Sequence, residues 1–178
     1  MRYLFLKPPL LHRFDHESFQ RRLSEHVRRW GIAYLLLIVG AALLQAHFAF
    51  GLNASPSLPH RFFLIHKGEL PQRWQYVAFR WPGGGPYPAG VTFVKVTAGM
   101  AGDTVTRADR DFFVNGMHVG QAKTLSRQGV PLELGPTGVL PAGRYYVRAP
   151  HPDSLDSRYR LTGWIAETQI IGRAYALF

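Results

Sequence analysis

Three short segments of the chain contain the side chains best suited to chemistry. They are Asn53–Pro59, Val94–Val105 and Pro152–Tyr159. The first segment contains Ser57 and the second contains Lys95. A serine hydroxyl becomes an effective nucleophile near neutral pH only when a base removes its proton, and a lysine can be that base only when its amine is neutral. The combination therefore suggests nucleophilic attack by a serine with a lysine as general base.

A lysine base needs an apolar environment. Lowering a lysine pKa from about 10.4 to about 7.5 requires the ammonium form to be disfavoured by about 4 kcal/mol, which desolvation can supply. Lys95 stands between Val94 and Val96, and Phe93 lies on the same face of the expected strand. These neighbours are what a buried lysine would have in a sequence.

Each of these residues is also consistent with an ordinary structural role. Ser57 belongs to a Ser-Pro-Ser-Leu-Pro stretch that is typical of turns. Lys95 is also consistent with an edge-strand lysine whose ammonium group reaches water. Asp156 and Arg158, two positions apart, are consistent with a local ion pair that holds a loop.

A histidine-dependent hydrolase is the competing catalytic design. The histidines nearest to the three segments are His60, His66 and His151. The chain has no Gly-x-Ser-x-Gly nucleophile elbow to support such a site. Cysteine catalysis and thiolate zinc sites are excluded because the chain has 0 cysteines. We expect no cofactor and no metal.

Ahead of these segments lies an uncharged apolar run, Gly31–Phe50, which is long enough as a helix to cross a hydrocarbon core of about 30 Å. Four arginines precede it, so the positive-inside rule places the N-terminus in the cytoplasm. These are Arg21, Arg22, Arg28 and Arg29. We therefore predict a basic cytoplasmic segment at 1–30, with helical character from His16 to Trp30, a single transmembrane helix at 31–50 and an extracytoplasmic domain at 51–178.

A buried core helix and a cleaved signal peptide both fit the apolar run less well than a membrane anchor does. A buried helix of a soluble core is rarely apolar on all sides over this length. A cleaved signal peptide has a shorter apolar region behind a short basic lead, whereas here the lead is about thirty residues long. An uncleaved membrane anchor is therefore favoured.

Composition and charge agree with a folded domain on a membrane. The chain has 178 residues and a formal net charge of +10, but its basic residues after the apolar run are scattered singly. Such scatter does not resemble a nucleic-acid-binding arm, and we expect no nucleic-acid partner. The 47% hydrophobic content is sufficient for a core, and the 18 glycines and 13 prolines predict many turns.

Short apolar runs separated by glycine and proline fill the remainder of the chain and predict strands. Asn115-Gly116 between two of the runs predicts a two-residue hairpin, because a type I′ turn needs positive φ at both positions. No helix of useful length is expected after residue 50, so the predicted fold is a mainly β domain preceded by one transmembrane helix. The predicted strands are 61–65, 75–79, 91–96, 111–114, 117–119, 144–147 and 169–178.

Several of these segments together resemble the type I signal peptidases. Within that family, the small size and single anchor look most like the branch that processes pilin subunits of conjugative transfer systems. The resemblance covers residues 51–178, with its motifs in the family's order. The motifs are Ser57–Pro59, Val94–Val96, Ala101–Val105, Leu140–Val147, Ser154–Tyr159, Gly163 and Ile170–Ala174.

The resemblance implies a role for each matching residue. Ser57 matches the nucleophile and Lys95 the general base of a Ser-Lys dyad. Ser55 matches a serine whose hydroxyl faces the oxyanion together with the backbone N–H of the nucleophile. Ser154 matches a serine that orients the lysine.

The supporting loop of the family is matched as well. Asp156 and Arg158 match its acidic and basic members. The aspartate is considered necessary in some members of the conjugative branch, so Asp156 is expected to be the third catalytic residue. The family cuts beside small residues, commonly alanine, which implies shallow pockets near the dyad.

The chain departs from the commonest family pattern at three places. Val96 follows the lysine where many members have an arginine, and Ala101 stands where they have a proline. Ala149–Pro152 replaces a Gly-Asp-Asn segment. The arginine and the aspartate would be expected to pair, so the loss of both is less disruptive than the loss of one. Asp153 or His151 is a candidate replacement.

The expected function is that of a membrane-anchored serine endopeptidase at the outer face of a bacterial cytoplasmic membrane. Its partners would be the bilayer and a membrane-inserted preprotein or prepilin. The acyl-enzyme could be resolved by water or by the substrate's own N-terminus, which would give a cyclic pilin; the sequence does not choose between them. An alternative is an inactive β domain that serves as a structural component of a secretion or conjugation apparatus. The sequence does not indicate an oligomeric state.

Overall fold

The computed structural model of the chain describes residues 16–178. The chain divides into two compact units, one that ends at Leu43 and one that runs from Leu44 to Phe178. The first consists of most of a long helix, and the second is a β domain that contains all three segments identified above.

Helix α1 runs from His16 to His47 and includes both the basic stretch and most of the apolar run. Its portion from Phe19 to His47 is 29 residues long and sufficiently apolar to cross a membrane. Large apolar side chains on this portion are exposed to the surroundings; Ile32, Leu36 and Leu37 are examples. The helical character expected for His16–Trp30 is present, and residues 1–15 of the predicted basic segment lie outside the described residues.

The predicted end of the helix is wrong by three residues. The helix stops at His47, and Phe48–Leu52 forms strand β1, which pairs antiparallel with β2 (Phe62–Lys67). The pairing brings Phe48 opposite His66, whose ring stacks on the Phe48 ring with centroids 4.9 Å apart. A neighbouring strand thus satisfies the backbone hydrogen bonds of these apolar residues. The β domain therefore begins before residue 51.

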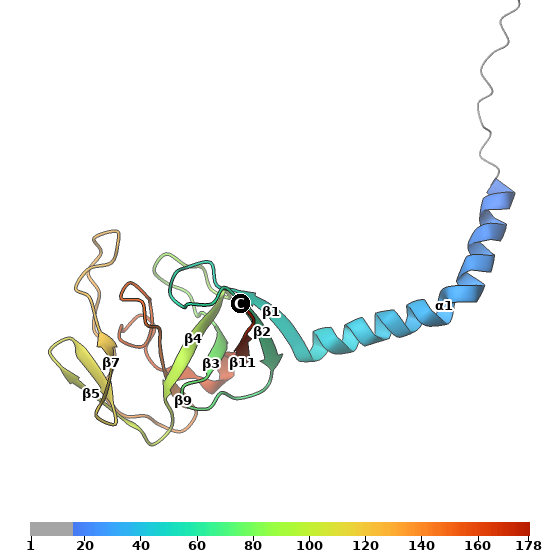
Figure 1. Cartoon of the computed structure of the whole chain (residues 1–178). Coiled ribbons are helices and arrows are strands. Elements are labelled where there is room, and N and C mark those ends of the chain that lie inside the picture. The colour runs from blue at the N-terminus through green and yellow to red at the C-terminus, as the bar shows by residue number, and fades with distance from the viewer. Residues whose placement is uncertain (1–15) are drawn as a thin grey trace, which may run out of the picture. The chain divides into compact units, whose positions relative to one another are not determined.

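Within the described residues, a seven-stranded antiparallel sheet forms the larger part of the β domain, in the order β1-β2-β11-β3-β4-β9-β10. Strands β11, β3, β4 and β9 lie side by side at its centre (Figure 1). A single turn of 3₁₀ helix precedes β11. The remaining strands of this sheet are β3 (Tyr76–Arg80), β4 (Thr92–Gly99), β9 (Arg144–Arg148), β10 (Ile165–Ala166) and β11 (Ile170–Ala176).

A four-stranded sheet in the order β7-β6-β5-β8 follows β4 in the chain. Its hairpin turn is Asn115-Gly116, with φ of 49° and 78°, as the type I′ prediction requires. Figure 1 shows this sheet to one side of the larger one. Its strands are β5 (Thr104–Ala108), β6 (Asp111–Val114), β7 (Met117–Gln121) and β8 (Gly138–Val139).

Three apolar clusters hold the domain together. Phe63, Ile65 and Val94 belong to a cluster on one face of the larger sheet, and Phe79 and Trp81 belong to another cluster formed by buried side chains of the same sheet. A third cluster lies between the smaller sheet and the segment after β9 and includes Phe112, Tyr146 and Tyr159. Among the described residues after His47 there is no α-helix, so the predicted mainly β class is confirmed.

Candidate active site

Lys95 lies within β4, directly opposite Val77 on the neighbouring strand β3. Only 6% of its surface is exposed. Its side chain shares a face of the sheet with Phe93, whose ring centroid is 5.5 Å from Lys95 Nζ. The ammonium group therefore does not extend into water as that of an ordinary edge-strand lysine would, and the valines that flank it in the sequence do mark a buried position.

Burial changes the acidity of this amine. The pKa of Lys95 is lowered to about 8, mainly by desolvation; the negative charge of Asp156 opposes this effect and the positive charge of Arg158 adds to it. Lys95 Nζ donates a hydrogen bond of 2.8 Å to Ser154 Oγ, and both groups are buried. Because the acceptor is a neutral hydroxyl rather than a carboxylate, this contact orients the amine without adding a counter-charge.

Ser57 lies in the loop that closes the β1–β2 hairpin. The loop is closed by a backbone hydrogen bond of 2.8 Å from Asn53 N to Arg61 O. Ser57 is 4% exposed, and its Oγ accepts a hydrogen bond of 2.9 Å from Ser55 Oγ. Both hydroxyls also lie within hydrogen-bonding distance of Asn53 Oδ1, at 3.3 Å from Ser57 and 3.2 Å from Ser55. The stretch therefore forms the predicted turn, and the turn brings the hydroxyls of Ser55 and Ser57 together.

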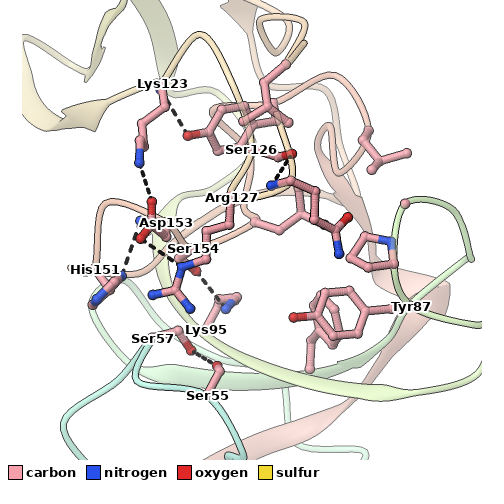
Figure 2. Close-up of a pocket in the computed structure, with 18 of the residues that line it drawn as sticks. Ser55, Ser57, Tyr87, Lys95, Lys123, Ser126, Arg127, His151, Asp153 and Ser154 are labelled. Carbon is pink, nitrogen blue, oxygen red and sulfur yellow. Dashed lines mark hydrogen bonds and ion pairs between the residues drawn. The ribbon is translucent and has the colours of Figure 1, made fainter. Parts of the chain in front are cut away.

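Ser57 and Lys95 line the same groove (Figure 2). The groove has a volume of about 1340 Å³. Its walls come from the Ser57 loop, residues 85–87, the start of β4, the 123–133 loop between β7 and β8, and the segment after β9. Ser57 is hydrogen-bonded to Ser55 and Asn53 rather than to Lys95. The Ser57 hydroxyl thus does not donate to the lysine amine in this arrangement, and catalytic hydrogen bonds commonly tighten only when substrate is bound.

Asp156 and Arg158 form a buried ion pair that does not line the groove. Arg158 Nε donates to Asp156 Oδ1 at 2.8 Å, and Asp156 Oδ2 accepts from Ala149 N at 3.0 Å. Arg158 Nη1 donates to Gln121 O on β7 at 2.7 Å. The pair therefore connects the 151–158 loop to both sheets, which matches the local ion-pair interpretation. Asp156 is placed to act on Lys95 through its charge and through the position of Ser154.

The same pair determines the charge state of Arg158. Desolvation opposes its positive charge, but the hydrogen bonds and negative charge of Asp156 outweigh that effect and raise the pKa of Arg158. Arg158 therefore stays charged beside Lys95 and favours the neutral form of the lysine. Asp156 raises the pKa of Lys95 more than Arg158 lowers it, so burial, and not the ion pair as a whole, favours the neutral lysine.

The candidate replacements for the missing family pair are engaged elsewhere. Asp153 accepts a hydrogen bond of 2.5 Å from Lys123 Nζ and one of 3.0 Å from Arg127 Nε. His151 Nδ1 accepts from the backbone N–H of Asp153 at 3.2 Å. Neither side chain hydrogen-bonds Lys95. Among residues 16–178, Ser154 is the side chain that holds the lysine amine.

The histidines do not form a catalytic pair with a serine. His60 packs edge-on against Phe63 and Tyr76 in the apolar cluster that includes Leu58. His66 Nδ1 bonds Glu69 at 2.8 Å. Within residues 16–178 no histidine hydrogen-bonds a serine side chain, so the geometry gives no support to a histidine-dependent hydrolase.

One edge of β4 is open beside Lys95. On one side β4 pairs with β3 along Thr92–Val96, but on the other side β9 pairs with it only from Val96 to Gly99. Within the described residues, Thr92–Lys95 thus has no strand partner on the second side, and this stretch lines the groove. An open strand edge offers free N–H and C=O groups to an extended peptide. Lys95 therefore lies at the end of an unpaired strand edge that faces the groove.

Asn53 is a functional candidate that the sequence alone did not reveal. Its side-chain oxygen lies within hydrogen-bonding distance of both serine hydroxyls of the loop, and its amide donates to His60 O at 3.3 Å. The available signal in the sequence was the position of Asn53 in a proline-rich turn, two residues before Ser55 and four before Ser57. Asn side chains commonly organise such turns.

Comparison with known proteins agrees with these features. A family model described as signal peptidase, peptidase S26, matches residues 23–178. The chain is 30% identical over 183 residues to signal peptidase I of Bacillus amyloliquefaciens and to signal peptidase I T of Bacillus subtilis (strain 168), with 91% of this chain and 90% of each relative covered. A crystal structure of a signal peptidase I from Enterococcus faecalis V583 matches at 25% identity with a TM-score of 0.41, over 62% of this chain and 98% of that one.

Proposed function

The chain belongs to the signal peptidase family, peptidase S26, and from this premise we propose that it is a membrane-anchored serine endopeptidase with a Ser57–Lys95 dyad. Ser57 is the nucleophile and Lys95 is the general base. Ser154 positions the lysine, and the Asp156–Arg158 pair holds the loop that carries Ser154.

The observation that carries this proposal is the buried amine beside a buried serine hydroxyl in one groove. With a pKa of about 8 for Lys95, about a quarter of the molecules have a neutral amine at pH 7.5, whereas an exposed lysine would be almost entirely charged. Burial of an amine without a carboxylate partner costs stability, as does retention of a serine nucleophile in a buried turn. A purely structural β domain has no need of either, which disfavours the inactive alternative.

Acylation follows from the geometry of the dyad. Ser57 rotates away from Asn53, neutral Lys95 Nζ takes the proton from Ser57 Oγ, and Oγ adds to the scissile carbonyl carbon. The backbone N–H of Ser57 and the hydroxyl of Ser55 face the resulting oxyanion. Collapse of the tetrahedral intermediate breaks the C–N bond as the Lys95 ammonium gives its proton to the leaving amine. The product is an ester between Ser57 and the acyl half of the substrate.

Deacylation uses the same base a second time. Neutral Lys95 takes a proton from a water molecule, whose oxygen attacks the ester carbon. The Lys95 ammonium returns that proton to Ser57 Oγ as the ester bond breaks, which releases Ser57. Aminolysis by the substrate's own N-terminal amine would instead form a new amide bond and a cyclic product. We propose processing of a prepilin as the specific task, because the small size and the single anchor resemble the conjugative branch of the family; cyclisation is the outcome that an amine nucleophile would give.

An extended substrate would bind by adding a strand to the open edge of β4. The free backbone groups of Thr92–Lys95 would hydrogen-bond the substrate main chain and bring the scissile bond to Ser57 at the end of that edge. A substrate side chain that faces β4 meets the groove wall of Val94 and the Ser57 loop, so small residues are favoured next to the cut.

Helix α1 would anchor this site to a membrane. We propose that the helix spans the bacterial cytoplasmic membrane once, with the arginine-rich end in the cytoplasm and the β domain on the outer side. Ser57 is ten residues beyond the helix end at His47, so a fully extended connection would reach at most about 36 Å. A substrate inserted in the same bilayer gains effective concentration at this site.

A cleavage assay in membranes tests the dyad. Ser57→Ala, Lys95→Ala and Lys95→Arg should each lose at least about 1000-fold in processing of a preprotein substrate, because nucleophile and base act as a unit. Lys67→Ala on β2 is the matched lysine control and should keep near-normal activity, and circular dichroism checks that each variant folds. Near-normal processing by Ser57→Ala or Lys95→Ala would refute the dyad.

A further inference from the structure

Three charged side chains lie together on the rim of the groove. Asp153 accepts hydrogen bonds from Lys123 Nζ at 2.5 Å and from Arg127 Nε at 3.0 Å. All three residues line the groove, and Figure 2 draws them along one side of it together with His151. Two cations share one carboxylate, so this rim cluster of Lys123, Arg127 and Asp153 has a net positive charge.

The rim cluster is directly connected to the dyad. Asp153 precedes Ser154 in the chain, and Ser154 Oγ holds Lys95 Nζ at 2.8 Å. Adjacent Cα atoms are about 3.8 Å apart, so the carboxylate that holds Arg127 lies one residue from the hydroxyl that holds the base. A substrate cannot continue along β4 beyond Lys95, because β9 occupies that edge from Val96 onwards. The substrate must leave the sheet there, and the rim cluster lies next to the exit.

Arg127 keeps unused hydrogen-bond donors at this position. Its Nε bonds Asp153, whereas no described residue accepts a hydrogen bond from its Nη1 or Nη2 atoms, and its side chain is 66% exposed. Hydrogen bonds from Lys123 and Arg127 lower the pKa of Asp153, so the carboxylate remains ionised and continues to hold the guanidinium. A guanidinium that is fixed through Nε presents a pair of donors suited to a carboxylate.

The loop that carries Arg127 is ordered by its own contacts. Ser126 Oγ accepts from Gln128 N at 3.2 Å and from Val130 N at 3.1 Å. Arg110 donates to the carbonyl oxygens of Lys123 and Leu132, which closes the base of the loop. Arg127 is therefore held at a defined place on the rim by its surroundings, and little order has to be gained when a ligand binds.

We propose that Arg127, fixed by Asp153 and accompanied by Lys123, is a specificity subsite for a carboxylate on the part of the substrate that leaves the sheet at Lys95. The inference rests on the proposed peptidase function and adds a charge preference to it. The carboxylate is either an Asp or Glu side chain within a few residues of the cut or a free C-terminus at that distance. Other described cations that line the groove are less available, since Arg160 pairs with Glu133 and Lys95 is buried.

A peptide series with the full-length enzyme in membranes tests the subsite. In one set of peptides, Asp, Asn or Lys stands at each of three positions on either side of the cut. Two further peptides end three residues past the cut, one with a free C-terminal carboxylate and the other with a C-terminal amide. Wild type should favour the carboxylate over its neutral match by about fivefold in kcat/KM at one side of the cut only, and the preference should shrink as salt is added. The comparison of the carboxylate-ended peptide with the amide-ended one shows whether a free C-terminus, rather than an Asp or Glu side chain, is the preferred carboxylate.

Variants assign the preference to Arg127. Arg127→Gln should reduce the Asp/Asn ratio to about one, Arg127→Lys should retain part of it, and Arg127→Glu should favour the lysine peptide. Arg107→Gln is the control, because Arg107 is an exposed arginine on β5 away from the groove and should leave the ratio unchanged. Binding of the same peptides to the Ser57→Ala variant should follow the same order.

The outcomes separate this inference from the proposed function. If wild type cleaves none of the peptides in a preparation that also fails to process a preprotein, the peptidase proposal fails. If wild type cleaves Asp, Asn and Lys peptides equally at all six positions, or if Arg127→Gln keeps the wild-type ratio, the subsite is refuted while the dyad stands.

Discussion

The burial of Lys95 lowers the stability of the folded protein. In the unfolded chain its pKa would be near 10.4, whereas desolvation in the folded protein lowers the pKa to about 8. The unfolded state therefore binds more protons between these values, and the stability of the folded state rises with pH across that window. Below about pH 8 the full cost of the buried charge is present, on the order of 3 kcal/mol.

Replacement of this lysine by an apolar residue should therefore stabilise the protein. Lys95→Met should raise the free energy of unfolding by about 2 kcal/mol at pH 7, because it removes the desolvation cost and loses only one hydrogen bond, to Ser154. The gain should shrink as pH rises from about 8 towards 10. Denaturant titrations of both proteins at several pH values measure this difference. A less stable variant at pH 7 would contradict the assigned burial cost.

Residue chemistry predicted much of the site. The need for a neutral amine identified Lys95 between two valines, and the structure buries it. The family resemblance paired Ser154 with Lys95, and the two are hydrogen-bonded. Asn53 was missed, because the convergence of two hydroxyls on one amide oxygen depends on the turn's three-dimensional shape. Asp156 pairs with Arg158 and does not line the groove, and its expected catalytic role stays a prediction.

The loop that holds Ser154 is positioned by close backbone contacts with another loop. Gly135 N donates to Arg158 O at 2.7 Å, and a Cβ atom added at Gly135 would lie 2.2 Å from Ser157 O. Such an overlap with backbone cannot be relieved by a side-chain rotation, so the 151–158 loop would have to move. The approach of these two loops therefore requires a residue without a side chain.

Gly135→Ala should lower the free energy of unfolding by about 2 kcal/mol or more and reduce kcat by displacing Ser154. Gly40→Ala, where an added Cβ meets nothing within 4 Å, is the control and should leave both quantities nearly unchanged. Thermal unfolding and single-turnover cleavage measure the two effects. Wild-type stability and kcat in Gly135→Ala would show that the loop tolerates the overlap, contrary to this prediction.

Among the elements, periodicity predicted seven of the strands, β2, β3, β4, β6, β7, β9 and β11. It missed β5, which buries only Val105 among its five residues, and also β8 and β10, which have two residues each and leave no pattern. β1 was assigned to the membrane helix because its apolar residues continue the preceding run, and pairing with β2 decides its state. The open edge of β4 was beyond prediction, since it depends on where β9 begins to pair.

At the scale of the whole molecule, one unit contains the entire site. The groove, the dyad residues and the rim cluster all belong to the unit from Leu44 to Phe178, and the apolar helix supplies the membrane anchor in the proposed function. The sequence predicts a boundary after residue 50, because twenty uncharged residues followed by short alternating runs represent two different kinds of folding unit.

The pH dependence of kcat/KM for the full-length chain in membranes tests most directly whether Lys95 serves Ser57 as a neutral base. Because only the uncharged amine can accept the proton, kcat/KM should rise tenfold per pH unit at low pH and level off above about 8, the pKa of Lys95. A rate that levels off near pH 6.5, as a histidine base would give, or that does not change between pH 6 and 9, would contradict the role of Lys95 as the base.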